Sequence, residues 1–242
     1  MRTTRIYFDG CIETGAIIRL TTGASHHLVR VLRHRRGANI RVFNGRGGEY
    51  LACMLDENPK HTELRIDAFI DIDTESSLQL TLLQGICRVD RMDMIVQKAV
   101  EFGVRRIVPV LCQRGSRLNS SGMAKKHERW RQIAISACEQ SARTAVPIIA
   151  EVVYLQNAVA ASSSQLKLLL DPATGDGLKQ LGNNASSISI LIGPEGGLAP
   201  DEIQAARDAG FQSLRFGPRV LRTETAGIAA ISSCQLLWGD MG

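Results

Sequence analysis

From residue 78 to its end, the chain alternates short apolar runs with longer stretches of helical periodicity. The first run, Leu78–Cys87, is almost continuously apolar, as in a strand buried on both faces. The stretch Asp90–Gly103 follows, with apolar residues three or four positions apart, Asp90 as its expected N-cap and Gly103 at its end. Strands that alternate with helices favour a mostly parallel sheet covered by helices. We therefore expect an α/β domain here.

The same patterns predict the remaining elements of this domain. They are strand Arg106–Leu111, a helix over about Lys125–Arg143, strands Ile148–Val153, Leu166–Leu170 and Ser187–Ile192, helix Pro200–Ala209, a strand near Leu214–Phe216 and helix Glu224–Trp238.

Residues 1–70 have a different organisation, in which short apolar segments are separated by turn sequences such as Asp9-Gly10 and Asn44-Gly45. Many short strands in so few residues are typical of a small barrel. The expected strands are Arg5–Phe8, Ile17–Leu20, Asn39–Phe43, Glu49–Leu55 and Glu63–Ile70, with one or two helical turns within His26–Arg36. The polar segment Asp71–Ser77 predicts a linker, which divides the chain into domains at 1–72 and 73–242.

Basic side chains are concentrated in two blocks. The 242-residue chain has a net charge of +5, yet residues 1–50 carry +6 and residues 88–143 carry +7, with acidic and uncharged residues between them. Two basic blocks indicate either a polyanion held at two places or two solvated basic surfaces. Arginine outnumbers lysine in the first block, and its planar guanidinium suits phosphate contacts.

Several classes of protein are disfavoured. No apolar run approaches the roughly eighteen residues of a membrane-spanning helix. No apolar segment follows the basic N-terminus as in a signal peptide, so we expect a cytoplasmic protein. The six cysteines are dispersed, without a C-x-x-C pair or a nearby histidine, so we expect no metal and reduced, buried thiols. Neither a G-x-S-x-G nor an H-E-x-x-H motif occurs.

Two glycine-containing loops are the strongest local signals. Gly193-Pro-Glu-Gly-Gly197 follows an apolar strand, at the end where open α/β sheets bind ligands. Its glycines allow either a plain tight turn or a close approach of a ligand to the main chain. The second loop, Phe216–Ala226, also leaves a strand through Gly-Pro and enters a helix, with Thr223 as the expected N-cap. Capping does not explain the two arginines in that loop.

Taken together, Gly193-Pro-Glu-Gly-Gly197 and Leu221-Arg-Thr-Glu-Thr-Ala226 closely resemble the paired motifs of the SPOUT methyltransferases, specifically the RsmE family of 16S ribosomal RNA (uracil-N3) methyltransferases. Further segments similar to the same family, in the same order, are His27–Arg33, Asp90–Val104 and Ala137–Arg143. One departure is Gln113–Ser116, where the family has Glu-Arg-Ser, which affects only the shape expected of that loop.

This resemblance implies the fold, the cofactor and the partners. Residues 1–72 would form a PUA-like, RNA-binding β-barrel, and residues 73–242 an α/β methyltransferase domain with a deep trefoil knot. The cofactor would be S-adenosylmethionine (SAM), and the reaction would methylate N3 of a uridine in 16S rRNA of the small ribosomal subunit. The enzyme would be a homodimer.

The resemblance also implies site residues. The cofactor would be held, mainly by main chain, at Leu170, Gly193, Pro194, Glu195, Gly196, Gly197, Phe216, Gly217, Leu221 and Thr225. Arg222 would organise the catalytic site, with Glu224 orienting it or accepting a proton; alternatively, both residues only hold their loop in shape. RNA would contact Arg5, His27, Arg30 and Arg33 in the first domain and Arg88, Lys98, Arg114 and Arg117 in the second.

Two other functions stay open. One is a SPOUT enzyme that methylates a ribose 2′-hydroxyl. The other is a non-catalytic rRNA-binding assembly factor, although a protein that only binds RNA would not need two glycine loops of this kind.

Overall fold

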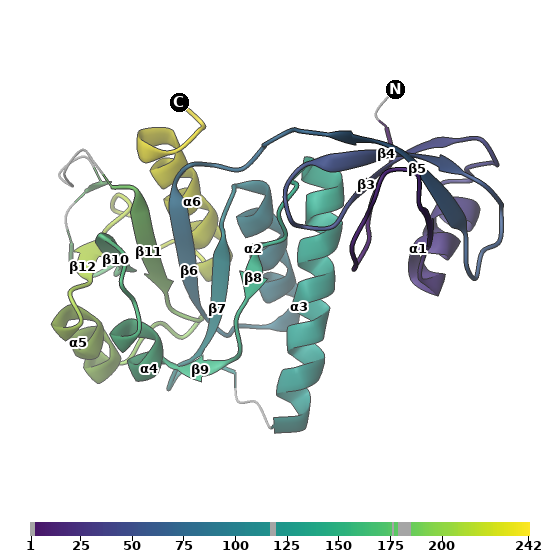
Figure 1. Cartoon of the computed structure of the whole chain (residues 1–242). Helices are drawn as coiled ribbons and strands as arrows, with labels where there is room; N and C mark the ends of the chain where they lie inside the picture. Colours follow the sequence, from purple (N-terminus) through teal and green to yellow (C-terminus); the bar gives the residue numbers. More distant parts are fainter. Residues whose placement is uncertain (1–2, 117–119, 176, 179–184) are drawn as a thin grey trace. The chain divides into compact units, whose positions relative to one another are not determined.

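The computed structural model describes residues 3–116, 120–175, 177–178 and 185–242, which form two compact units (Figure 1). The N-terminal unit comprises Met1–Glu75 and Cys138–Val146. The C-terminal unit comprises Ser76–Ala137 and Pro147–Gly242. The N-terminal unit is therefore built from two separate stretches of chain.

A five-stranded sheet forms the N-terminal unit. Its strands, in the spatial order β1-β3-β4-β5-β2, are β1 (Arg5–Tyr7), β3 (Asn39–Phe43), β4 (Glu49–Met54), β5 (Glu63–Ile70) and β2 (Ile17–Arg19). Strand β1 pairs in parallel with β3, and the other neighbours are antiparallel. A short helix α1 (Thr22–His26) and a π-helical turn η1 (His27–Val31) connect β2 to β3. The five strands agree with the sequence prediction to within a residue.

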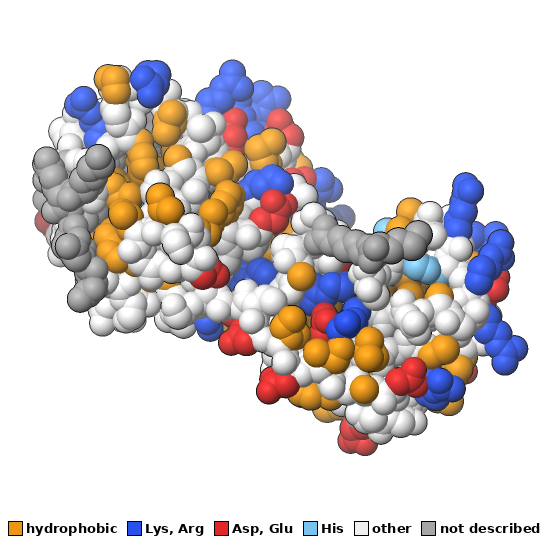
Figure 2. All heavy atoms as spheres, turned by 90° about the horizontal axis from the view of Figure 1, so that it is seen from above, with side chains coloured by type: hydrophobic (Ala, Val, Ile, Leu, Met, Phe, Trp, Pro, Cys, Tyr) orange, Lys and Arg blue, Asp and Glu red, His pale blue; other side chains and the backbone are white. Residues whose placement is uncertain are grey.

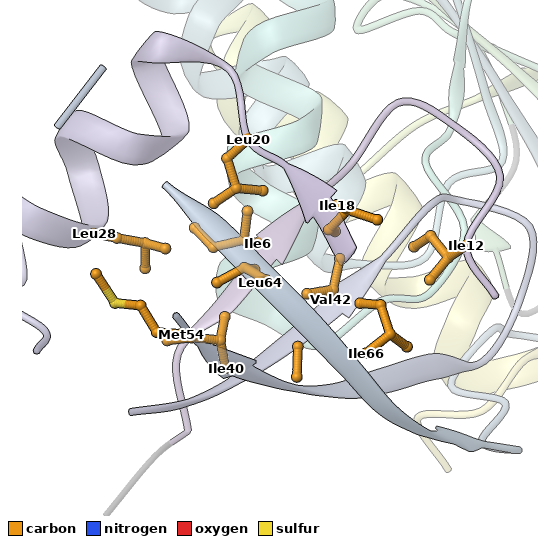
Figure 3. Close-up of a cluster of buried hydrophobic side chains, with 11 residues drawn as sticks. Ile6, Ile12, Ile18, Leu20, Leu28, Ile40, Val42, Met54, Leu64 and Ile66 are labelled. Atoms are coloured by element: carbon orange, nitrogen blue, oxygen red, sulfur yellow. The ribbon is translucent and has the colours of Figure 1, made fainter. Parts of the chain in front are cut away.

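The period-two pattern of these strands places one face of the sheet in the core. On β3, Ile40 and Val42 are fully buried, and on β5 so are Leu64 and Ile66. These side chains meet others from β1, β2 and β4 in one cluster, to which η1 adds Leu28 (Figure 3). Each fully buried side chain of this kind contributes about 1.5–3 kcal/mol relative to an exposed one.

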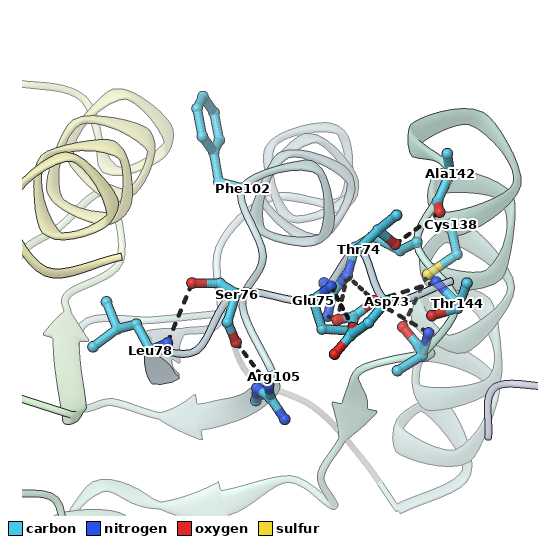
Figure 4. Close-up of polar contacts among 12 residues, drawn as sticks. Asp73, Thr74, Glu75, Ser76, Leu78, Phe102, Arg105, Cys138, Ala142 and Thr144 are labelled. Carbon is cyan, nitrogen blue, oxygen red and sulfur yellow. Dashed lines mark hydrogen bonds and ion pairs between the residues drawn. The ribbon is translucent and has the colours of Figure 1, made fainter. Parts of the chain in front are cut away.

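The last turn of helix α3 (Ser120–Ser141) and the residues that follow it, up to Val146, complete the N-terminal unit. Glu75 binds this stretch. The Glu75 and Arg143 side chains are 8% and 5% exposed, and Arg143 Nε donates to Glu75 Oε2 at 3.0 Å. The other carboxylate oxygen accepts the backbone N–H groups of Thr144 and Ala145, both at 3.2 Å. Figure 4 shows Glu75 close to Thr144, just after the end of α3.

A parallel sheet forms the centre of the C-terminal unit. Its spatial order is β12-β10-β11-β6-β7-β8, with β9 also pairing with β7, and every recorded pairing is parallel. The strands are β6 (Gln79–Gly85), β7 (Arg106–Leu111), β8 (Ile148–Ile149), β9 (Val153–Tyr154), β10 (Leu166–Leu170), β11 (Ser187–Ile192) and β12 (Gln212–Leu214). The helices of this unit, besides α3, are α2 (Val89–Glu101), α4 (Leu155–Ala160), α5 (Pro200–Asp208) and α6 (Thr223–Trp238). The predicted α/β fold class is confirmed.

Several local predictions are wrong in detail. The expected strand Ile148–Val153 is two short strands, β8 and β9, and the six-residue helix α4 was not predicted because it is too short to show a helical period. Strand β12 ends at Leu214, two residues earlier than expected. Helix α2 has Arg88 rather than Asp90 as its N-cap.

The sheet order explains where a ligand site can form. Because β10, β11 and β12 are parallel neighbours, the loops that follow their carboxyl ends gather at one edge of the sheet. Helix α6, which follows the β12 loop, packs against α2 and β11. None of the described helices has the length and apolar character needed to span a membrane.

Candidate cofactor pocket and active site

A pocket of about 510 Å³ lies at this edge of the C-terminal unit. Its walls are the residues that follow β10, β11 and β12, together with the start of α6. The residues expected at the cofactor site that line it are Leu170, Gly193, Pro194, Glu195, Gly197, Phe216 and Leu221. The guanidinium-bearing side chains that line it are Arg91, Arg114, Arg215, Arg219 and Arg222. The pocket thus combines apolar and main-chain walls with a surplus of positive charge.

Glycine is required where the β11 loop turns against the sheet. Gly197 has a φ of 70°, and its N–H donates to the carbonyl of Pro194 at 2.9 Å, which closes the turn. A Cβ at Gly85, at the end of β6, would lie 2.7 Å from the backbone nitrogen of Pro194. The glycines therefore allow the loop to lie directly on the end of the neighbouring strand.

Thr223 ties the two glycine loops together. Its hydroxyl donates to the Gly193 carbonyl at 2.7 Å and accepts from Gln84 Nε2 at 3.0 Å. The prediction that Thr223 is the N-cap of α6 is wrong, because Arg222 takes that position and makes no side-chain capping bond. Thr223 is the first helical residue, and its hydroxyl bonds across to the other loop.

The expected pairing of Glu224 with Arg222 is not what the structure records. The recorded cation partner of Glu224 is Arg91 of α2, whose Nε lies 3.8 Å from Glu224 Oε2. Arg91 Nη1 also lies 3.4 Å from Glu195 Oε1. Arg222 is exposed at the pocket, and no bond to Glu224 is recorded among the described residues. No contact among the described residues therefore supports the expectation that Glu224 orients Arg222.

Arg91 is a residue of the pocket that the two glycine loops do not include and that the sequence alone does not predict as a site residue. It lies more than a hundred residues before both glycine loops, and only the fold brings it to them. One signal was present, because a cation in the first turn of a helix opposes the helix dipole and needs a local reason.

Three residues expected at the cofactor site do not line the pocket: Gly196, Gly217 and Thr225. Gly196 faces the backbone of Arg114, whose carbonyl would lie 2.9 Å from a Cβ at this position. Gly217 has a φ of 65°, a backbone requirement of its own turn. Thr225 is exposed on α6.

Arg5, expected to contact RNA, has a different role. Its side chain is 7% exposed, pairs with Glu49 at 2.9 Å and lies over the ring of Phe43. It also donates to the carbonyls of Cys138 and Arg143. These contacts show that the Arg5 side chain stabilises the N-terminal unit from within and is not accessible to an RNA partner.

The other predicted RNA-binding residues are mostly accessible. His27, Arg30 and Arg33 are exposed in and after η1, and Figure 2 shows Lys and Arg side chains gathered along one margin of the N-terminal unit. In the C-terminal unit Arg88 and Arg114 are exposed, whereas half-buried Lys98 pairs with Glu101 at 2.9 Å. Arg117 lies outside the described residues.

The cysteines are only partly as expected. All six are free thiols, but Cys11 is exposed and two others are half-buried. Burial raises the pKa of four of them to about 12, namely Cys87, Cys112, Cys138 and Cys234. Among the described residues, no three His, Cys, Asp or Glu side chains are grouped to hold a metal ion.

Comparison with known proteins gives a consistent result. Residues 74–235 match the model of the RNA methyltransferase domain, and residues 20–67 match that of the RNA methyltransferase PUA domain. The chain is 31% identical over 242 residues to the ribosomal RNA small subunit methyltransferase E of Buchnera aphidicola, covering 99% of this chain and 98% of that protein. Its Bacillus subtilis counterpart is 28% identical, with 95% of each chain covered.

Two solved structures are also similar over the full length of both chains. A Legionella pneumophila methyltransferase in complex with SAM has a TM-score of 0.97 at 37% identity. The SAM-bound ribosomal RNA small subunit methyltransferase E of Neisseria gonorrhoeae has a TM-score of 0.92 at 36% identity.

Proposed function

The chain belongs to the ribosomal RNA small subunit methyltransferase E family, and from this premise we propose that it transfers a methyl group from SAM to N3 of a uridine in 16S rRNA. It is an rRNA methyltransferase that uses SAM. The choice of uracil N3 as the acceptor follows from the resemblance of its two C-terminal loops to those of the uracil-N3 enzymes. The pocket formed by those loops is the observation that carries the proposal.

The pocket suits SAM in size and lining. A volume of about 510 Å³ lies within the range of about 300–1,000 Å³ typical of small-molecule sites. Leu170, Leu214 and Phe216 offer apolar contacts to an adenine ring, and the bare main chain at Gly193 permits a close approach. When bound, SAM supplies a methyl group made electrophilic by its positive sulfonium. Gly196 and Gly217 act in this proposal through the backbone shape of their loops, and Thr225, which lies on α6, is left without a role in it.

The chemistry of uracil sets what the protein must do. N3 carries a proton in the neutral base and lies on the Watson–Crick edge, so the base must be unpaired and lose that proton. Arg222 is exposed at the pocket, where its guanidinium stabilises the negative charge on the uracil as donors stabilise an oxyanion. We propose that Glu224, which lies in the first turn of α6 two residues after Arg222, accepts the proton, although Glu224 does not itself line the pocket.

Binding of rRNA engages both units in this proposal. Exposed His27, Arg30, Arg33, Arg88 and Arg114 contact phosphates, with Lys98 in a secondary role because Glu101 already pairs with it. Such binding weakens steeply as salt rises, because each neutralised phosphate releases counterions. Filter binding of rRNA over a series of salt concentrations measures how steeply the binding constant falls with salt. A binding constant that does not change with salt would contradict these contacts.

The proposal extends to features of the family that accompany this activity. The enzyme is a cytoplasmic homodimer, and the β12 loop and α6 form part of a trefoil knot. The small residues of α6 support the knot, because a Cβ at Gly227 would lie 3.3 Å from the Ile192 side chain of β11. Light scattering of the purified protein gives its molar mass in solution, which should be that of two chains.

The deciding experiment is methylation of unmodified small subunits and of naked 16S rRNA, with the product nucleoside identified by mass spectrometry. We expect 3-methyluridine. A 2′-O-methylated nucleoside would favour the ribose-modifying alternative, and RNA binding without SAM binding would favour an assembly factor.

Arg222→Ala tests the catalytic assignment. It should abolish methylation while leaving SAM binding and rRNA binding close to wild type. If SAM binding is lost as well, Arg222 holds the loop in shape and does not act on the base.

A further inference from the structure

Arg91 lies in the first turn of helix α2, a position that is electrostatically unfavourable for a cation. With Arg88 as the N-cap, it is the third residue of α2, so its charge opposes the helix dipole. Its side chain is only 26% exposed and lines the pocket. A cation kept in an unfavourable local position indicates that a tertiary contact outweighs the local cost.

That contact involves two carboxylates from two different loops. Arg91 Nη1 faces Glu195 Oε1 at 3.4 Å, and Arg91 Nε faces Glu224 Oε2 at 3.8 Å. Glu195 belongs to the β11 loop, and Glu224 lies in the first turn of α6. Among the described residues, Arg91 is the recorded cation partner of both.

The two carboxylates differ in what else holds them. Glu195 Oε1 also accepts the backbone N–H of Arg88 at 3.0 Å, so it keeps one anchor without Arg91. Glu224 Oε2 is buried and has no hydrogen-bond partner among the described residues. Loss of Arg91 would therefore leave Glu224 far less restrained than Glu195.

We propose that Arg91 is a positioning residue for methyl transfer, which holds the SAM-binding loop through Glu195 and the catalytic segment through Glu224 with separate nitrogens of one guanidinium. The proposal rests on the proposed function of this pocket. It divides the effect of Arg91 into two measurable parts, one on SAM affinity through Glu195 and one on turnover through Glu224.

The test compares Arg91→Met and Arg91→Lys with Glu195→Gln, Glu224→Gln and the double variants. Arg91→Met should weaken SAM binding by about fivefold, as expected for a partly exposed ion pair. It should lower kcat by roughly ten- to a hundredfold, the cost of misplacing a reacting group. Calorimetry measures SAM binding without RNA, and saturating substrates give kcat.

The double variants show whether Arg91 acts through these carboxylates. Arg91→Met/Glu224→Gln should have a kcat no lower than that of Glu224→Gln alone. Arg91→Met/Glu195→Gln should bind SAM no more weakly than Glu195→Gln alone. Effects that add in both pairs would overturn the proposal. Arg91→Lys should restore at most one of the two effects, because an ammonium is a single point charge; restoration of both would overturn the bridging role.

Arg129→Met is the matched control. Arg129 pairs with Asp93, which lies on the same helix two residues after Arg91, but Arg129 does not line the pocket. Its removal should leave kcat and SAM affinity within about twofold of wild type. An equal loss in this variant would mean that loosening α2 is sufficient, which contradicts a specific role for Arg91. Thermal midpoints of all variants show whether each one is folded.

The outcome is separable from the proposed function. If the wild-type product is a methylated nucleoside other than 3-methyluridine, the acceptor assignment fails. The coupling of Arg91 to Glu195 and Glu224 is then measured by the formation of that product, with the same single and double variants and the same criteria.

Discussion

Glu75→Gln should destabilise the N-terminal unit by about 3–5 kcal/mol, the cost of removing one partner from a buried ion pair. The Glu75 and Arg143 side chains are 8% and 5% exposed, so water does not replace the lost carboxylate. Glutamine keeps the shape and one acceptor oxygen, so the amides of Thr144 and Ala145 retain a partner and the lost charge dominates. A double replacement, Glu75→Leu with Arg143→Met, should recover part of the loss, because neither charge is then buried.

Hydrogen exchange followed by mass spectrometry over a urea series gives the free energy of opening for peptides of β4 and β5. The control is Glu63→Gln, which breaks the pair with Arg19 whose side chains are 34% and 66% exposed. This exposed pair should contribute less than about 1 kcal/mol. Equal losses of the free energy of opening in Glu75→Gln and Glu63→Gln would refute the reasoning, because the contribution of an ion pair to stability would then not depend on its burial.

Three further predictions concern the pocket and the titrating groups. Thr223→Val removes the donor to Gly193 and should lower the free energy of unfolding by about 1–3 kcal/mol, measured by urea denaturation with SAM affinity followed in parallel. Burial raises the pKa of Cys87 to about 12, so its reactive thiolate is scarce at neutral pH, and mass spectrometry should find that alkylation modifies exposed Cys11 first. Burial also raises the pKa of Glu139, so the folded state holds that proton more tightly than the unfolded state. Stability should therefore fall as pH rises through the range in which Glu139 ionises, and Glu139→Gln should reduce this fall in thermal midpoints recorded from acidic to neutral pH.

The fold was predictable where local pattern and burial coincide. The apolar run at Leu78–Cys87 is β6, the central strand between β11 and β7, and it is apolar because both faces are covered. The alternation in Glu63–Ile70 predicts β5 to the residue, because only one face meets the core. Helix α4 could not be predicted, because six residues are too few to establish a helical period.

The site was predictable only where its residues are close in sequence. The two glycine loops identify most of the pocket because each loop is continuous, and parallel strands deliver both to the same edge. Arg91 and Arg5 could not be placed from sequence, because a guanidinium looks the same whether it meets solvent, phosphate or a distant carboxylate. Only the fold shows that Arg91 meets Glu195 and that Arg5 is buried against Glu49.

The discontinuity of the N-terminal unit has a consequence for the chain as it is synthesised. All five strands of its sheet emerge from the ribosome before residue 76, but the segment Cys138–Val146 emerges only after β6, α2, β7 and most of α3. Until then Glu75 lacks Arg143, and Arg5 lacks the carbonyls of Cys138 and Arg143. During synthesis, these polar groups of the sheet therefore stay hydrated until the segment Cys138–Val146 has been made. A truncated protein that ends after β5 and Glu75 would lack these partners permanently, so Arg5 and Glu75 would stay exposed to water.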